Sequence, residues 1–79
     1  MVMATIIGMP EQLSDSDRAI LTFEAHAPRA IGAKEEAITT QLGLTPVRYY
    51  QKLNLLLDDP SALSEFPQLV RRLQRLRDR

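Results

Sequence analysis

The sequence predicts an all-α protein. Its apolar residues recur three and four positions apart, as Ile38 and Leu42 do, which is the spacing of one face of a helix. Capping residues and prolines stand where such stretches begin, and no alternating strand pattern is sustained. A chain of 79 residues has room for one hydrophobic core. We therefore expect a single helical domain over residues 13–79, preceded by a flexible N-terminal arm over residues 1–12.

The first predicted helix opens at Ser14. Ser14 and Asp17 form a variant of the capping box, in which a side chain accepts a hydrogen bond from the backbone three residues later. An apolar stripe that includes Ile20 continues to about Ala27, and Pro28 ends the helix. We expect this helix to be scaffold that packs behind the rest of the domain.

The next stretch has the pattern of helix, tight turn, helix. A helix is predicted from about residue 33 to residue 42, and Gly43 can end it in the left-handed conformation. Thr45 can cap the following helix, and Pro46 suits its first position because no amide hydrogen is needed there. This spacing is typical of a helix-turn-helix that binds DNA. An ordinary pair of helices in a small bundle would keep the same apolar positions.

The helix predicted over residues 46–57 has two possible registers. The preferred register buries Tyr49, Leu53 and Leu56, whereas the rival register buries Tyr50 and Leu57. Arg48 is exposed in both. In the preferred register the outward side chains are Val47, Gln51 and Asn54, flanked by Arg48 and Tyr50. Together this set can donate hydrogen bonds, accept them or stack.

The C-terminal part is predicted to hold two further helices. Asp59 and Pro60 begin a short one that ends at about Glu65, and a second follows from Pro67 to about Arg77. The second has an apolar stripe, formed by Leu69, Val70, Leu73 and Leu76. Its other face is basic, and we expect three of its residues to contact phosphates, namely Arg71, Arg72 and Arg75. A solvated basic face is the alternative.

The formal net charge is zero, but the charges are segregated along the chain. Residues 1–28, 29–54, 55–69 and 70–79 carry net charges of −3, +2, −3 and +4. Positive potential is therefore expected at the helix-turn-helix and at the C-terminal end.

Composition excludes several classes of function. The chain has no cysteine and one histidine, which argues against a disulfide framework and a zinc site. Acids are plentiful, but no pair of carboxylates is set for acid/base chemistry, and no glycine-rich phosphate loop or cysteine nucleophile is present. No apolar run approaches the roughly 18 residues of a membrane span. We expect a cytoplasmic protein that is not an enzyme and needs no cofactor, metal, small-molecule ligand or membrane.

Four strings of residues carry a resemblance to a known family. LSDSDRAILTFE, GAKEEAI, GLTPVRYYQKLNLLLDDP and LVRRLQRLR resemble the small actinobacterial helix-turn-helix proteins typified by the GATC-binding nucleoid-associated protein of streptomycetes. The likeness covers about residues 13–77 and is most specific from Arg48 to Pro60. It implies a homeodomain-like fold that binds short, GATC-like sites across the chromosome, and hence a location on the nucleoid.

The resemblance also implies which residues meet DNA. Lys34 and Tyr49 are expected near the sugar-phosphate backbone. The chain departs from the family at residues 26–29, where the family is aromatic and basic. Its N-terminal arm also has no Lys or Arg before Arg18 that could contact the minor groove, and Arg29 is the nearest substitute for such a contact. Lys52 completes the set of candidate DNA-binding residues. The residues expected in the major groove are Thr45, Pro46, Val47, Arg48, Tyr50 and Gln51.

The predicted function is therefore sequence-selective binding of double-stranded DNA, by a monomer or weak dimer that regulates transcription or organises the nucleoid. The alternative is a helical protein-interaction module, such as a transcription accessory or an antitoxin-like partner, which zero net charge favours. Salt separates the two, because phosphate contacts weaken steeply with salt and an apolar interface does not.

Overall fold

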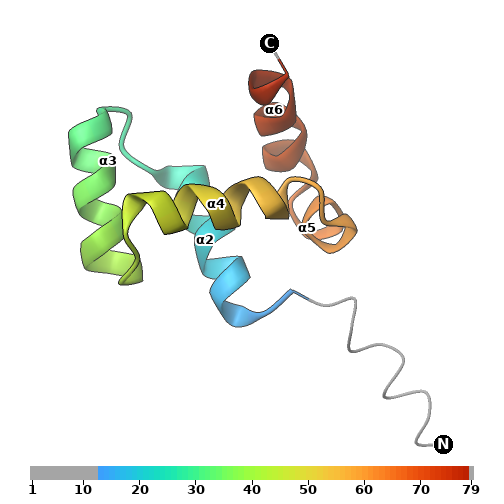
Figure 1. Cartoon of the computed structure of the whole chain (residues 1–79). Coiled ribbons are helices and arrows are strands. Elements are labelled where there is room, and N and C mark those ends of the chain that lie inside the picture. The colour runs from blue at the N-terminus through green and yellow to red at the C-terminus, as the bar shows by residue number, and fades with distance from the viewer. Residues whose placement is uncertain (1–12, 79) are drawn as a thin grey trace, which may run out of the picture.

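Residues 13–78, which the computed structural model describes, form five α-helices and one π-helical turn without a strand. The all-α prediction is confirmed, and the predicted arm over residues 1–12 lies outside the described residues. In Figure 1, α4 crosses in front of α2, with α3 beyond one end of α4 and α5 and α6 beyond the other. The elements are α2 (Asp15–His26), α3 (Ile31–Ala37), η2 (Ile38–Leu42), α4 (Pro46–Leu56), α5 (Pro60–Glu65) and α6 (Pro67–Arg77).

Helices α2, α4 and α6 begin at predicted positions, and two of these starts are fixed by side-chain caps. The hydroxyl of Ser14 accepts a hydrogen bond from the amide of Asp17 at 3.0 Å. The hydroxyl of Thr45 accepts one from the amide of Arg48 at 3.2 Å. Such caps satisfy amides that have no partner within the helix. Helix α5 is capped in the same way by a carboxylate of Asp59.

The second helix starts two residues earlier than predicted, at Ile31. Its N-cap, Ala30, has no side-chain acceptor, so no capping signal marks this start in the sequence. Its continuation, η2, is π-helical. There the hydroxyls of Thr39 and Thr40 donate to the carbonyls of Glu35 and Glu36, which offers these carbonyls a partner other than a backbone amide.

The turn before α4 depends on one glycine. Gly43 has a φ of 68° and a ψ of 23°, and its amide donates to the carbonyl of Thr39 at 3.1 Å. This left-handed conformation is costly for residues with a Cβ. The predicted left-handed end of the helix is therefore confirmed.

The core confirms the preferred register of α4. Tyr49 is fully buried, and Leu53 and Leu56 are buried on the same side. Leu57, which belongs to the rival register, is also buried, because the end of α4 is covered by the C-terminal helices as well as by α2. The other buried apolar residues are Leu13, Ile20, Leu21, Ala37, Ile38, Ala62, Leu69 and Val70.

A part-buried polar cluster joins α2, α3 and α4. We call it the Glu24 cluster, and it consists of Glu24, Lys34 and Tyr49. The Lys34 ammonium lies 2.9 Å from a carboxylate oxygen of Glu24, and the Tyr49 hydroxyl donates to that same oxygen. The side chains of Glu24 and Lys34 are only 11% and 15% exposed. Burial, and then the hydrogen bond to Glu24, raise the pKa of Tyr49 above its ordinary value.

Aromatic rings surround this cluster. The ring of Tyr49 meets those of Phe23 and Tyr50 edge to face, with centroids 5.6 and 5.1 Å apart. The Lys34 ammonium lies 5.4 Å from the ring centroid of Tyr50, within the range of a cation–π interaction. Three helices are thus held by contacts that share a few side chains.

An ion pair and a hydrogen bond attach α5 and α6 to α2 and α4. Arg18 of α2 donates two hydrogen bonds to Glu65 of α5, at 2.9 and 3.1 Å, and these bonds lower the pKa of the Glu65 carboxyl. At the other end, Gln74 of α6 donates to the carbonyl of Leu57 at 2.6 Å. The predicted apolar stripe of α6 is wrong at Leu76, which is 54% exposed, because the last turn of α6 projects beyond the bundle (Figure 1).

Removing the Tyr49 hydroxyl should destabilise the fold. Tyr49→Phe leaves the ring in place but takes a hydrogen bond from the part-buried carboxylate of Glu24, and a hydrogen bond to a charged group is worth about 1.5–3 kcal/mol. We expect urea denaturation to show a loss of that size. Tyr50→Phe is the matched control, because within residues 13–78 its hydroxyl has no hydrogen-bond partner, and its stability should stay within about 0.5 kcal/mol of the parent. Equal stabilities of the two variants would contradict the role given to Glu24.

A methyl group at Gly43 should be costly for conformational reasons alone. An added Cβ would meet no atom within 4 Å, so the cost of Gly43→Ala is that of the left-handed conformation, about 1–2 kcal/mol. Gly32→Ala is the control, since Gly32 lies in α3 and an added Cβ there also meets nothing within 4 Å. It should raise stability by up to about 1 kcal/mol. A melting temperature of Gly43→Ala at or above the parent's would show that the turn is not constrained.

Candidate nucleic-acid interface

One face of α4 is open to solvent and carries polar and apolar side chains together. Val47 is 66% exposed, and Arg48 and Gln51 are exposed beside it. Tyr49 and Leu53 lie on the opposite, buried face. This division follows from the helical period, because residues four apart share a face and residues two apart do not. The prediction that Arg48 is exposed in either register is confirmed.

The start of α4 lies at the surface. Thr45 is exposed and Pro46 is half-buried, and both stand directly after the turn at Gly43. The hydroxyl of Thr45 accepts a hydrogen bond from the amide of Arg48, so the first turn of α4 is ordered without a ligand. The guanidinium of Arg48 has no partner among the described residues and is available to one.

Two of the predicted contact residues are instead part of the Glu24 cluster. Tyr49 is fully buried and bonded to Glu24, so its side chain does not reach the surface and the expectation of a DNA contact from it is corrected. The ammonium of Lys34 points to the same carboxylate rather than to the N-terminal end of α3. Its charge is paired there with Glu24, so the phosphate contact that the resemblance implies for Lys34 would have to compete with this ion pair.

The remaining predicted residues lie on the flanks of α4 or in the link before α3. Tyr50 and Lys52 are half-buried on opposite flanks of α4. Arg29 is exposed in the link between α2 and α3. Asn54, which was expected on the outward face, is exposed but accepts a hydrogen bond from Arg77 of α6 at 3.2 Å.

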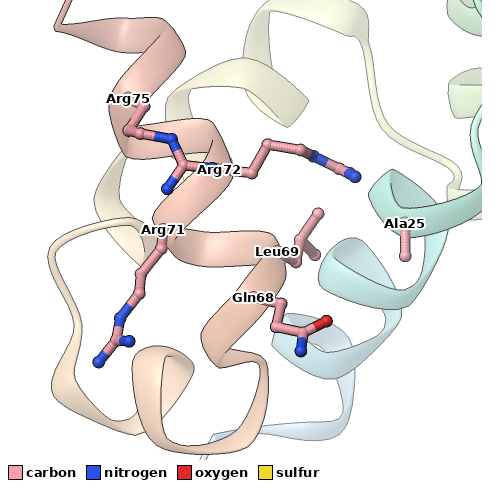
Figure 2. Close-up of a pocket in the computed structure, with 6 residues that line it drawn as sticks. All are labelled: Ala25, Gln68, Leu69, Arg71, Arg72 and Arg75. Carbon is pink, nitrogen blue, oxygen red and sulfur yellow. The ribbon is translucent and has the colours of Figure 1, made fainter.

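A second basic surface lies between α6 and the end of α2. It is a hollow of about 530 Å³, which we call the arginine hollow. In Figure 2, the side chain of Arg72 reaches toward Ala25 of α2, whereas that of Arg71 extends away from it. The hollow is lined by Ala25, Gln68, Leu69, Arg71, Arg72 and Arg75.

The arginines of α6 differ in their partners. Arg77 is paired with Asp58, at 3.0 Å, and that bond raises the pKa of its guanidinium. Among residues 13–78, no ion pair or hydrogen bond from a side chain involves Arg71, Arg72 or Arg75. The structure thus brings together the three residues that were expected to contact phosphates and leaves their charges unneutralised.

Glu24 is the important residue that the sequence did not single out. It is spaced for the buried side of α2, four residues after Ile20, and that placement of an acid on an apolar stripe is the signal that identifies it. A buried carboxylate needs a cation or hydrogen-bond donors, which Lys34 and Tyr49 supply.

The described residues hold no group of three or more His, Cys, Asp or Glu side chains that could bind a metal ion. None of the helices within residues 13–78 has the length and apolar character needed to cross a membrane.

Comparison with known proteins assigns the chain to a family. The chain matches no curated protein and no solved structure. The model of a family described as a protein of unknown function, DUF3263, matches residues 12–79, which is nearly the whole chain. The chain therefore belongs to the DUF3263 family.

Proposed function

We propose that this protein binds double-stranded DNA sequence-selectively by placing α4 in the major groove. The observation that carries the proposal is the start of α4, where an ordered turn presents Val47, Arg48 and Gln51 on one exposed face. An α-helix fits the major groove, and the first turns of a recognition helix are the part that meets the base edges. Buried contacts of α4 with α2 and α3 support a rigid placement.

The side chains on this face match the groups that bases display. The guanidinium fork of Arg48 suits the two acceptors of guanine, and the amide of Gln51 suits the acceptor and donor of adenine. The methyl groups of Val47 can contact the methyl group of thymine. A short site that mixes these bases fits the GATC-like site that the family resemblance implies. We further propose that the protein resides on the nucleoid, where such sites are frequent.

The phosphate contacts of this interface come from its edges. Arg29 is exposed in the link, and Lys52 lies on the flank of α4. Contacts of this kind fix orientation and carry no sequence information. Lys34 and Tyr49 are not included, because their polar atoms are bonded to Glu24.

A helical protein-interaction module is the second candidate. Two large apolar side chains on α4, Val47 and Leu55, are 66% and 73% exposed, and the formal net charge is zero. An interface that buries them would depend little on salt, whereas binding to DNA would weaken steeply as salt rises. Titration of a duplex at two salt concentrations therefore distinguishes the two functions.

Arg48→Ala should reduce discrimination between DNA sequences. We expect the preference for a GATC-containing duplex over a scrambled duplex of equal length to fall by about 1–3 kcal/mol, the value of a bidentate contact with a base. Fluorescence anisotropy with both duplexes at one salt concentration measures this preference.

Arg48→Lys is the matched control, because it keeps the charge and loses the planar fork. It should retain affinity for the scrambled duplex and lose most of the preference. If both variants keep the parent's preference, Arg48 does not read a base. If the parent protein binds neither duplex, the protein-interaction module is the better assignment.

A further inference from the structure

The arginine hollow presents charge that the fold itself does not neutralise. Two other arginines, Arg18 and Arg77, stabilise the fold, because each is bonded to a carboxylate elsewhere in the chain. Among residues 13–78, Arg71, Arg72 and Arg75 have no such carboxylate. These three guanidinium groups carry positive charge that no acid of the described residues offsets, so a bound anion would be stabilised there.

The hollow faces away from α4. Gln74 and Arg77 form the side of α6 that contacts the end of α4. With a helical step of 100° per residue, Arg72 lies about 170° around α6 from the middle of that side. The hollow is lined by residues of α6 and by Ala25 of α2, and no residue of α4 contributes to it (Figure 2).

The orientation of α2 gives the same result. The buried residues of α4, among them Tyr49 and Leu53, pack toward α2, so α2 lies on the side of α4 opposite to its exposed face. A duplex held against Val47, Arg48 and Gln51 would approach from that exposed face. The hollow is built on α2 and on the far side of α6, so Arg72, which lies opposite the α4-contacting side of α6, is directed away from this duplex.

We propose that the arginine hollow binds the phosphate backbone of a second DNA duplex, so that one molecule of this protein bridges two duplexes. The first duplex is the one held by α4, and in this respect the inference rests on the proposed function. Arginine suits the second contact because its guanidinium matches phosphate oxygens in geometry and charge. The residues that line the hollow include no aromatic side chain to stack on bases, so the second duplex is held without regard to its sequence.

A capture experiment tests the bridge. A biotinylated GATC-containing duplex is immobilised and loaded with the protein, and a labelled duplex of random sequence is then added. We expect the parent protein to retain the labelled duplex. The variant R71Q/R72Q/R75Q should load onto the immobilised duplex with an affinity within about twofold of the parent's and retain at least tenfold less labelled duplex. Circular dichroism establishes that the variant is folded.

The control variant is Gln68→Ala, which changes a neutral residue of the same hollow and should leave capture unchanged. Three results would overturn the bridge. The first is that the parent captures no second duplex. The second is weaker loading of the arginine variant on the immobilised duplex, with the slope of log K against log salt falling by about 0.9 per lost contact, which would place the arginines on the first duplex. The third is a dimer of the free protein in sedimentation that the arginine variant abolishes, which would mean that the hollow binds a second copy of this chain.

A second measurement separates failure of the bridge from failure of the proposed function. In an R48A/Q51A background, α4 no longer reads DNA, and the hollow alone should bind a random duplex at low salt. Adding R71Q/R72Q/R75Q should abolish that residual binding. If the parent shows no sequence preference but these arginines still account for its binding to DNA, the proposed function fails and the hollow remains a DNA site. If the residual binding is unaffected by the arginines, the hollow is not one.

Discussion

The position of α4 depends on one part-buried carboxylate. Glu24 of α2 accepts a hydrogen bond from Tyr49 of α4 and is paired with Lys34 of α3, so a single side chain ties three helices together. Removing either partner would leave the other charge uncompensated and partly shielded from water, which destabilises the fold. Small domains have little stability to lose. The angle at which α4 meets α2 and α3 is therefore set by charge and geometry as well as by apolar packing.

The cationic residues fall into two groups, those that pair with an acid of the fold and those that do not. Lys34 pairs with Glu24, and Arg77 pairs with Asp58. Arg48 on α4 and the arginines of the hollow on α6 have no carboxylate partner within residues 13–78. A chain with zero net charge can thus present two local basic surfaces, because many of its acids are used internally or lie along other edges. Net charge alone would have argued against nucleic acid, and the arrangement of the charges argues for it.

Local signals in the sequence predicted most of the fold. Ser14, Thr45 and Pro46 mark helix starts through caps and missing amides, and Gly43 marks the turn through its backbone freedom. These effects act between neighbours in the chain, so a sequence contains them in full. The early start of α3 at Ile31 escaped prediction because Ala30 offers no cap. The π-helical turn escaped because hydroxyls of threonine donate to carbonyls four residues earlier in ordinary α-helices too, so Thr39 and Thr40 do not by themselves indicate one.

The candidate site was predicted less completely, because its residues come from distant positions. Glu24 and Tyr49 are 25 residues apart, and nothing in the spacing indicates that they meet. The resemblance placed Lys34 and Tyr49 near the DNA, whereas Tyr49 is buried, as the preferred register of α4 predicts, and Lys34 is paired with Glu24. Asn54 and Arg77 likewise pair across 23 residues. Periodicity did identify the exposed face of α4, since that face is set by the helical repeat alone.

The central claim is that the exposed face of α4 is a surface for double-stranded DNA. The most direct measurement is a titration of ¹⁵N-labelled protein with a short GATC-containing duplex, followed by amide chemical shifts. The account predicts that the largest shifts fall in residues 45–51. These shifts should reach saturation at one duplex per protein molecule. Shifts centred on α5, or no shifts at low salt, would contradict it.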